Sequence, residues 1–314
     1  MVLIRMRYPS SRTLLVFALT LFVVAMFQGT ALAAKPTQKT FESPEVAVEA
    51  LIKALRDHNG KELLAIFGPG SEPLILSGDK VDDRERGDEF VRLYDDANHL
   101  EPAGDKKVIV HVGKNDWPFP IPIVKTGGSW RFDTKQGKEE ILHRRIGENE
   151  LDTIQTCLAI VDAQREYAAL DRDGDGLLAY AQKFESTKGK TDGLFWQVKP
   201  GEKPSPLGPL VAKAQGEGYV TGERPAPYNG YFYRILNAQG KSAKGGAYSY
   251  LVKGKMVGGF AVVAYPATYA VSGVKTFIVN HEGVVYEKDL GPKTVKLAKS
   301  MKVYNPDKTW KKAD

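Results

Sequence analysis

Three aspartates alternate with other residues in the stretch DRDGDGLLAYAQ, which runs from Asp171 to Gln182. A calcium-binding loop of the EF-hand type uses oxygen ligands at positions 1, 3, 5, 7, 9 and 12, with a glycine at position 6 for a sharp turn. In this numbering the ligands are Asp171, Asp173, Asp175, the Leu177 carbonyl, Ala179 through a water molecule, and Gln182, with Gly176 at the turn. Carboxylates this close repel one another unless a cation lies between them, so the spacing predicts a Ca²⁺ site.

The loop ends in Gln182, where an EF-hand has a bidentate glutamate, and this lowers the expected affinity. Glutamine offers one neutral oxygen, so we expect a dissociation constant on the order of 10⁻⁴ to 10⁻³ M, as in extracellular modules. The alternative is an acidic turn without metal, in which Asp and Gly cap adjacent helices. The sequence has no second loop of this kind, which favours a structural calcium clip over a paired calcium sensor.

The residue types that carry catalysis lack a comparable pattern. The histidines form no HExxH motif or other paired spacing, so the sequence supports no zinc site; they are His58, His99, His111, His143 and His281. Ser272, His281 and Asp289 supply the residue types of a catalytic triad, but no GxSxG elbow presents the serine. Cys157 lies in an apolar helical stretch and is expected to be buried and unreactive. We therefore assign no catalytic residue.

Neighbouring carboxylates and aromatic residues are further candidates. Glu139–Glu140 and Asp82–Asp83 are adjacent in sequence, and successive residues on a helix diverge by about 100°, so both pairs are expected on solvated faces. The DWPFP stretch, Asp116 to Pro120, permits two interpretations. It is either an aromatic surface, fixed by proline, that stacks on a sugar or a peptide, or a part of the core to which Trp117 and Trp130 belong.

The first 33 residues have the pattern of a secretory signal peptide. Three arginines precede an apolar run from Leu14 to Phe27, and Ala31 and Ala33 stand at the small-residue positions for cleavage after Ala33. The apolar run is short for a membrane span of roughly 20 residues, so no stable membrane anchor is expected after cleavage. We expect an exported protein, periplasmic or extracellular.

Charge and cysteine content exclude other classes. The formal net charge of +6 falls to +3 on cleavage, because the leader holds three arginines and no acid, and no Lys/Arg run exceeds two residues. This charge pattern gives no support for nucleic-acid binding. An exported chain with a single cysteine has no intramolecular disulfide, so burial, or in part a metal, must stabilise it.

Hydrophobic periodicity predicts an α+β protein. A helix starts at Pro44 after the N-cap Ser43, and others follow at 61–67 and 82–100; strands are expected at 74–78, at 106–113 and on both sides of the TGGS turn. A long helix over 138–170, with a break near Gly147 and Asn149, leads to the acidic loop and a short helix at 180–184. From residue 231 onward, four or five antiparallel strands form a meander.

These elements suggest a signal peptide at 1–33, an N-terminal α+β domain at 34–136, a helical connector at 137–200 that contains the loop 171–182, and a β-rich domain at 201–314. The order of elements in the N-terminal domain resembles the helices and small antiparallel sheet of nuclear-transport-factor-2-like domains. The final strands are similar to the C-terminal sheets of pilin-like proteins.

Most of the chain after the leader resembles one family. The segments that carry the resemblance are DWPFPIPIVK, WRFDT, EEILHRRIGENEL, DGLFW, SPLGPL, GYFYRIL, GGFAVVAYPA, TFIVN and VVYEKDLGP. They resemble the blocks of domain of unknown function 2950, a bacterial family of exported proteins, over roughly residues 41 to 310. The resemblance implies export but carries over no activity.

We therefore expect a cell-envelope protein that is a non-catalytic binding or assembly module, whose partner is an envelope protein or a glycan. The sequence leaves two alternatives open, an envelope hydrolase of peptidoglycan or polysaccharide and a pilus- or secretion-associated subunit. A hydrolase differs from the other two functions in what the structure should contain, because it needs titratable side chains that converge in one pocket.

Overall fold

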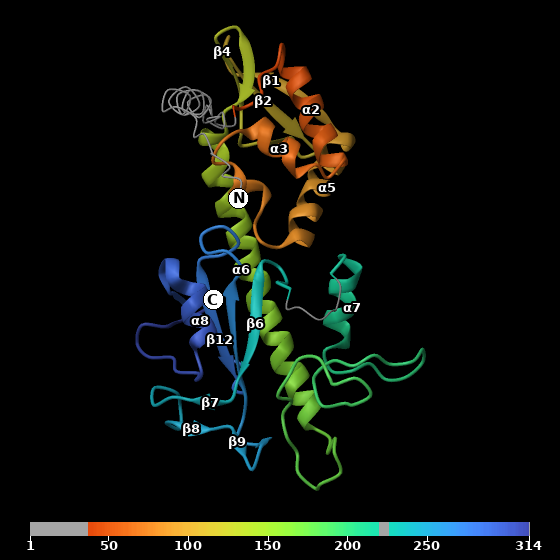
Figure 1. Cartoon of the computed structure of the whole chain (residues 1–314), viewed down its shortest axis with the longest axis vertical. Helices are drawn as coiled ribbons and strands as arrows, with labels where there is room; N and C mark the ends of the chain where they lie inside the picture. The colour runs from red at the N-terminus through yellow and green to blue at the C-terminus, as the bar shows by residue number, and fades with distance from the viewer. Residues whose placement is uncertain (1–36, 220–225, 314) are drawn as a thin grey trace, which may run out of the picture. The chain divides into compact units, whose positions relative to one another are not determined.

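The computed structural model describes residues 37–219 and 226–313. Gln38–Asp314 forms one compact unit, in which helices and antiparallel sheets are mixed as the α+β prediction requires (Figure 1). The leader predicted at 1–33 lies outside the described residues. Within the described part of the chain, no helix is both long and apolar enough to cross a lipid bilayer.

The N-terminal half begins with helices whose first turns are capped by side chains, the first of them by Ser43 as the sequence predicts. Ser43 accepts a hydrogen bond from the Val46 N–H, and Asn59 accepts one from Glu62 N–H, so orphan donors at two helix starts are satisfied. A third cap, Asp79, accepts from the N–H groups of two residues in the next helix. The helices are α2 (Pro44–Arg56), α3 (Gly60–Phe67), α4 (Glu72–Ile75) and α5 (Lys80–Asp96).

The strands that follow form the first sheet, in the order β1-β2-β4-β5, with β3 paired to β2. They are β1 (Asn98–Pro102), β2 (Lys107–Val112), β3 (Trp117–Pro118), β4 (Ile123–Thr126) and β5 (Ser129–Phe132). The TGGS turn joins β4 to β5 as predicted. Strand β1 was not expected, because we assigned its residues to the end of the preceding helix.

Helix α6 (Thr134–Ala168) runs through both halves without the expected break. The prediction of a break at Gly147 and Asn149 is wrong because tertiary contacts outweigh helix propensity. The Asn149 side chain is buried, where it donates to the Ser272 carbonyl at 2.9 Å and accepts from Arg86 at 3.0 Å.

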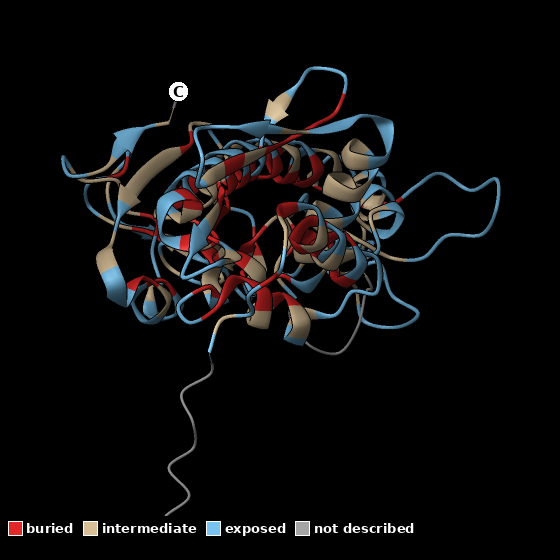
Figure 2. Ribbon diagram, turned by 90° about the horizontal axis from the view of Figure 1, so that it is seen from above, coloured by how far each residue is buried: buried red, intermediate tan, exposed pale blue. Residues whose placement is uncertain are grey.

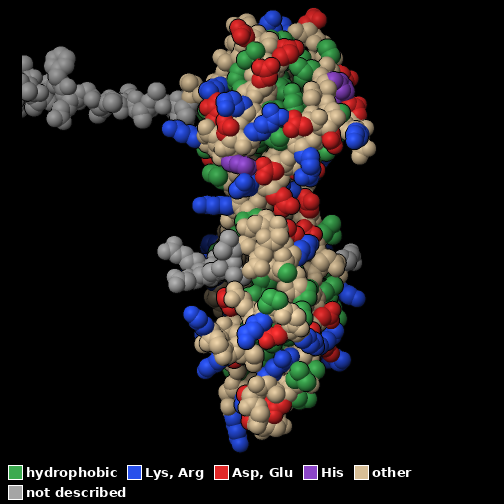
Figure 3. All heavy atoms as spheres, turned by 90° about the vertical axis from the view of Figure 1, so that its right-hand side faces the viewer, with side chains coloured by type: hydrophobic (Ala, Val, Ile, Leu, Met, Phe, Trp, Pro, Cys, Tyr) green, Lys and Arg blue, Asp and Glu red, His purple; other side chains and the backbone are tan. Residues whose placement is uncertain are grey.

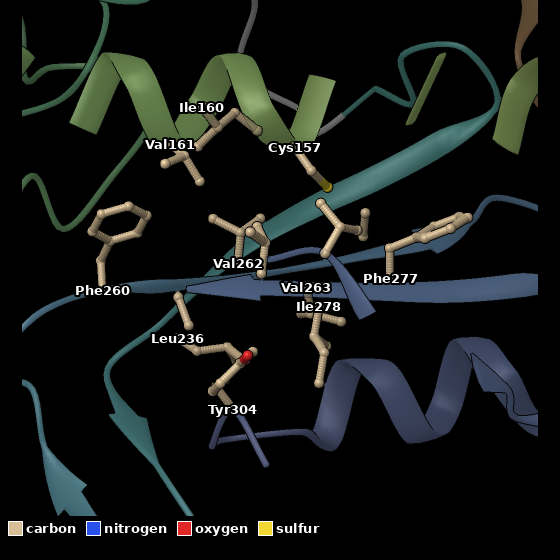
Figure 4. Close-up of a cluster of buried hydrophobic side chains, with 14 of the residues drawn as sticks. Cys157, Ile160, Val161, Leu236, Phe260, Val262, Val263, Phe277, Ile278 and Tyr304 are labelled. Carbon is tan, nitrogen blue, oxygen red and sulfur yellow. The ribbon is translucent and has the colours of Figure 1, made fainter. Parts of the chain in front are cut away.

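The C-terminal half is built on a second sheet with the order β14-β13-β12-β11-β6, all antiparallel. Its strands are β6 (Tyr231–Leu236), β11 (Ala261–Pro266), β12 (Lys275–Asn280), β13 (Tyr286–Asp289) and β14 (Lys311–Lys312). Helix α6 covers one face and α8 (Thr294–Ser300) the other (Figure 4). Between α6 and the sheet, Cys157 points from the helix toward the strands and Val262 points from its strand toward the helix. Ile278 points to the other side of the sheet, toward α8. The predicted meander is confirmed, although residues 248–256 contribute only short strands outside it.

Two other expectations are wrong. Residues 74–78 are not a strand: Leu74 and Ile75 belong to the short helix α4, which starts at Glu72 with Pro73 in its first turn and ends where the Leu76 N–H donates to the Glu72 carbonyl. Residues 180–184 are not a helix either. The Tyr180 N–H donates to the Met256 carbonyl, and the Ala181 N–H donates to the buried Gln164 side chain, so this segment is held extended. The remaining elements are α7 (Gly208–Gly216), β7 (Ala238–Gln239), β8 (Tyr248–Ser249), β9 (Leu251–Val252), β10 (Lys255–Met256) and η2 (Gly291–Lys293).

The described residues contain two hydrophobic cores, one in each half, and α6 contributes to both. Figure 2 shows the buried residues gathered in the interior with exposed loops around them. Gln38–Asp314 forms one compact unit. The domain boundaries predicted within it stay a prediction.

Two glycines of α6 test how closely this helix packs. A Cβ at Gly137 would lie 2.3 Å from the Pro120 carbonyl oxygen, which belongs to the backbone, whereas a Cβ at Gly147 would meet nothing within 4 Å. We predict that Gly137→Ala lowers the free energy of unfolding by about 1–3 kcal/mol, as overpacking does. Gly147→Ala should raise it by roughly 0.5–1 kcal/mol, because alanine favours a helix. Urea titration measures both, and equal effects of the two changes would contradict the packing.

Candidate functional site

The N-terminal half contains a cavity of about 700 Å³. Its inner wall comes from α2, α3, α5 and the segment around β3, and its open end from α5, α6 and α7. The cavity therefore combines residues that lie far apart in the sequence. None of the five histidines lines it.

The inner wall is aromatic and aliphatic. Phe90 lies between two neighbours, with its ring centroid 5.0 Å from that of Phe119 and 6.4 Å from that of Trp117. Phe119 and the aliphatic Ile121 are buried, and Trp117 is half-buried. Phe119 belongs to the core, and Trp117 and Trp130 are partly buried and pack against it, as the core interpretation of DWPFP requires. Trp117 also lines the cavity, and stacking on a sugar or a peptide stays a prediction. Such a wall binds the apolar body of a ligand.

The arginines at the open end are already engaged by the protein. Arg86 donates to Asp82 at 2.9 and 3.0 Å and to Glu148 at 2.6 Å. The buried Arg145 donates to the carbonyls of the segment 73–74. Arg144 pairs with Glu140 at 2.7 Å, and its guanidinium lies 5.2 Å from the Trp117 ring centroid. The expectation that Asp82 lies on a solvated face is wrong, since it is buried and lines this cavity.

Three acids line the open end, and we refer to Glu85, Asp152 and Glu217 as the acidic mouth. Glu217 pairs with Lys213 at 3.6 Å, whereas Glu85 and Asp152 form no ion pair among the described residues. Burial raises the pKa of Glu85 above its ordinary value, and the negative charges of Glu217 and Asp82 raise it further. Burial and the Glu148 charge likewise raise the pKa of Asp152. Oε2 of Glu217 is buried and has no hydrogen-bond partner among the described residues. This end of the cavity therefore favours a positively charged or hydrogen-donating group.

The predicted calcium loop forms a tight turn at the C-terminal end of α6. One oxygen of Asp171 accepts from the Gly174 N–H at 2.9 Å, and the other accepts from the Gly176 N–H at 2.8 Å. Gly174 and Gly176 have φ of 73° and 83°, which favours glycine at both positions. The carboxylates of Asp171, Asp173 and Asp175 come within 4.8 Å of one another, as the spacing predicts.

The same loop holds a cation of the protein itself. Nζ of Lys255, from β10, lies 2.7 Å from Asp173 and also contacts Asp175. The pKa of Lys255 is raised by these two carboxylates, and that of Asp175 is lowered by Lys255. Gln182 turns its amide toward the Gly254 carbonyl, to which it donates at 2.8 Å. Leu177 is half exposed. Calcium at this loop would compete with Lys255 for two of its ligands.

The comparison with protein families gives one match, which spans residues 38–313 and is described as "Protein of unknown function (DUF2950)". The chain belongs to this family. The resemblance found in the sequence segments is thus confirmed over nearly the whole chain. The comparisons with curated proteins and with solved structures gave no match. The finer likeness to nuclear-transport-factor-2-like domains therefore gains no support from a known structure.

The triad considered from the sequence does not assemble. Ser272 is buried and donates to the Thr268 carbonyl, His281 points its Nδ1 toward no partner among the described residues, and Asp289 accepts from Tyr269 and Gly291. Cys157 is buried as expected, and burial raises the pKa of its thiol to about 12, so no thiolate forms at neutral pH. The acidic mouth was missed because its members come from α5, α6 and the end of α7 and share no sequence spacing.

The raised pKa of Glu85, caused by burial and then by the charges of Glu217 and Asp82, predicts a dependence of stability on pH. Because the folded-state pKa of Glu85 is raised above 4.5, the folded state holds its proton more tightly than the unfolded chain, and the ionised side chain destabilises the fold as pH rises. We predict that Glu85→Gln raises the free energy of unfolding at pH 7 by roughly a few tenths of a kcal/mol, since Glu85 is largely solvated, and leaves it unchanged well below pH 4.5.

Chemical denaturation across this pH range measures the difference between the two proteins. Glu139→Gln removes the charge of an exposed glutamate on α6, away from the cavity, and serves as the control. A stabilisation by Glu85→Gln that persists at low pH would contradict an electrostatic cause.

Proposed function

We propose that this protein is an exported, non-catalytic binding module of the cell envelope, and that its cavity takes an amphipathic ligand with an apolar body and a cationic head. The observation that carries the proposal is the division of one cavity into an aromatic wall and the acidic mouth. The basic, apolar and small-residue pattern of the leader supports export. The cavity volume of about 700 Å³ falls in the range of pockets that enclose small organic ligands.

The charge of the ligand follows from which side chains are already paired. The arginines of the open end bind Asp82, Glu140 and Glu148, so an anionic head would have to displace existing pairs. A cationic head instead offsets the burial and the neighbouring negative charges that raise the pKa of Glu85 and Asp152. The gain is largest where water is excluded, because a low dielectric strengthens each interaction.

The alternative of an envelope hydrolase requires a general acid, a general base or a nucleophile in the same cavity. Two carboxyls with a raised pKa, Glu85 and Asp152, are present there. No described histidine or cysteine lines the cavity. Glycosidases work with two carboxyls alone, so turnover of a glycan substrate by the purified protein would overturn the proposal of a binding module.

Probes with one body and different heads test the proposal. We predict that 4-phenylbutylamine binds the purified protein more tightly than 4-phenylbutanol, and that 4-phenylbutyrate binds most weakly, because only the amine is attracted by the acidic mouth. Phe90→Ala should weaken all three, since the ring lies against two other aromatic residues of the wall. Isothermal titration calorimetry measures the affinities.

Removal of the charges of the acidic mouth separates the recognition of the cationic head from the recognition of the apolar body. The double variant Glu85→Gln, Asp152→Asn should reduce the preference for the amine over the alcohol by about tenfold, the equivalent of about 1.4 kcal/mol, and leave the affinity for the alcohol unchanged. Glu139→Gln is again the matched control. Equal affinities of the three probes for the wild-type protein would reject the cationic head.

We also propose that the loop 171–182 binds Ca²⁺ weakly as a structural clip at the end of α6. The support is the backbone of the loop: the Asp171 carboxylate accepts the N–H groups of Gly174 and Gly176, which curls the chain around the side chains of Asp173 and Asp175. The exchange of Lys255 for calcium replaces a single positive charge by a double one. Because Gln182 offers only one neutral oxygen, we expect a dissociation constant for Ca²⁺ on the order of 10⁻⁴ to 10⁻³ M.

Competition with Lys255 gives this proposal a direct test. We predict that Lys255→Gln increases the affinity for calcium by about tenfold, because the cation no longer displaces an ammonium group, and that Asp173→Asn abolishes binding. Lys253→Gln removes a charge from the neighbouring turn and is the control. Calorimetric titration with calcium measures each protein, and an unchanged or weaker affinity of Lys255→Gln would exclude binding at this loop.

A further inference from the structure

Two histidines that the sequence keeps apart are brought together by the first sheet. His99 on β1 lies directly opposite His111 on β2 in the antiparallel register. Their rings stack with centroids 4.7 Å apart and an interplanar angle of 18°. Because side chains alternate along a strand, both point to the face of β2 opposite Val110 and Val112, which belong to the hydrophobic core.

A third ligand-type side chain reaches this pair from the turn between β2 and β3. Asp116 has a φ of 56°, in the left-handed region that asparagine and aspartate tolerate better than other non-glycine residues. Its N–H donates to the Gly113 carbonyl at 3.0 Å, which closes the turn and directs the chain back over the strands. Oδ1 of Asp116 lies 3.4 Å from Nδ1 of His99 and 3.3 Å from Nδ1 of His111.

The surroundings of His111 call for a cation. Its ring is nearly buried, with Nε2 2.8 Å from Oε2 of Glu101, although Nε2 is not aligned for a hydrogen bond. On the other side, Nδ1 faces the carbonyl oxygen of Asp116 at 3.2 Å and its Oδ1. Oxygen acceptors thus lie on both sides of the ring, and a neutral imidazole has one N–H for both. The second side therefore lacks a donor or a cation, and a metal ion on Nδ1 supplies the cation.

We propose that His99, His111 and Asp116 bind a divalent transition-metal ion, with Zn²⁺ as the best fit. Two imidazole nitrogens and a carboxylate oxygen are zinc ligands. In a tetrahedral site with bonds of 2.0–2.1 Å, ligand atoms are about 3.3–3.4 Å apart, which is the separation of Asp116 from each histidine nitrogen. Glu101 then takes the place of the carboxylate that fixes a metal-bound histidine through its other nitrogen.

The site is open on one side. More than half of the side chains of His99 and Asp116 is exposed, so the exposed His99 ring is free to tilt off the stack and direct its Nδ1 at the ion. A fourth position faces solvent and is available to water or to a ligand from another molecule. A bound metal ion joins β1, β2 and the turn before β3 at one point. This point is next to Trp117, which pairs with β2 and belongs to the wall of the cavity.

Zinc uptake by the purified protein tests the inference. We expect one zinc ion per chain in equilibrium dialysis followed by metal analysis, and a visible absorption band of a four-coordinate site when Co²⁺ replaces zinc. His99→Ala and Asp116→Asn should abolish uptake. Glu101→Gln should weaken it by about tenfold, since it removes only the support of a ligand. His99 and Asp116 are exposed, so neither change is expected to prevent folding, which circular dichroism verifies.

His143→Ala is the matched control, because it removes an exposed histidine of α6 that is not one of the proposed ligands and must leave zinc uptake unchanged. The inference fails if the wild-type protein takes up no zinc. It also fails if zinc remains bound to folded His99→Ala and Asp116→Asn, since the ion then lies elsewhere, for instance at the aspartates of the loop 171–182.

Discussion

A set of buried polar contacts joins the two halves of the described chain, and both cores depend on it. Asn149, in the middle of α6, donates to the Ser272 carbonyl of the C-terminal half and accepts from Arg86 of the N-terminal half. The buried Asp79 caps α5 with one carboxylate oxygen and with the other accepts from Tyr219 and from the Gly230 N–H. Burial raises the pKa of Asp79, and these hydrogen bonds oppose the shift. Such groups are costly to bury unless they are hydrogen-bonded, so they specify one arrangement of the two halves.

The same contacts determine the electrostatics of the cavity. Arg86 is held by Asp82, Glu148 and Asn149, so it forms no ion pair with Glu85 or Asp152 and acts on them only through its more distant charge, which lowers the pKa of both. The charge balance of the acidic mouth thus depends on how the halves are joined. The structural role of the arginines and the proposed preference for a cation have one origin.

The sequence predicted those helices and strands whose formation depends on residues close together in the chain. The first two helices follow from caps and apolar spacing, the TGGS hairpin from its turn residues, and the final sheet from strands rich in Val, Ile and aromatic residues. Strand β1 was missed because Asn98–Pro102 has a single apolar residue, Leu100, and follows directly after a helix. Because β1 was not predicted, its register with β2 could not be predicted either, and the sequence showed His99 and His111 as two isolated histidines.

The sites divide in the same way. The aspartate loop is contiguous, so its conformation could be inferred from spacing, but its contact with Lys255 joins residues about 80 positions apart. The cavity is assembled from α2, α3, α5, α6 and α7, and no single segment contains its pattern of apolar wall and acidic mouth. Long-range packing therefore decides the properties that local periodicity does not encode.

The single cysteine gives the C-terminal core a reporter of its own. Cys157 lies in α6 against the second sheet and is completely inaccessible to solvent (Figure 4). Charged side chains of both signs are scattered among hydrophobic side chains over the face shown in Figure 3. A thiol reagent reaches the sulfur of Cys157 only when α6 separates from the strands, so the labelling rate of the native protein measures the opening of this core. No other thiol contributes to that signal.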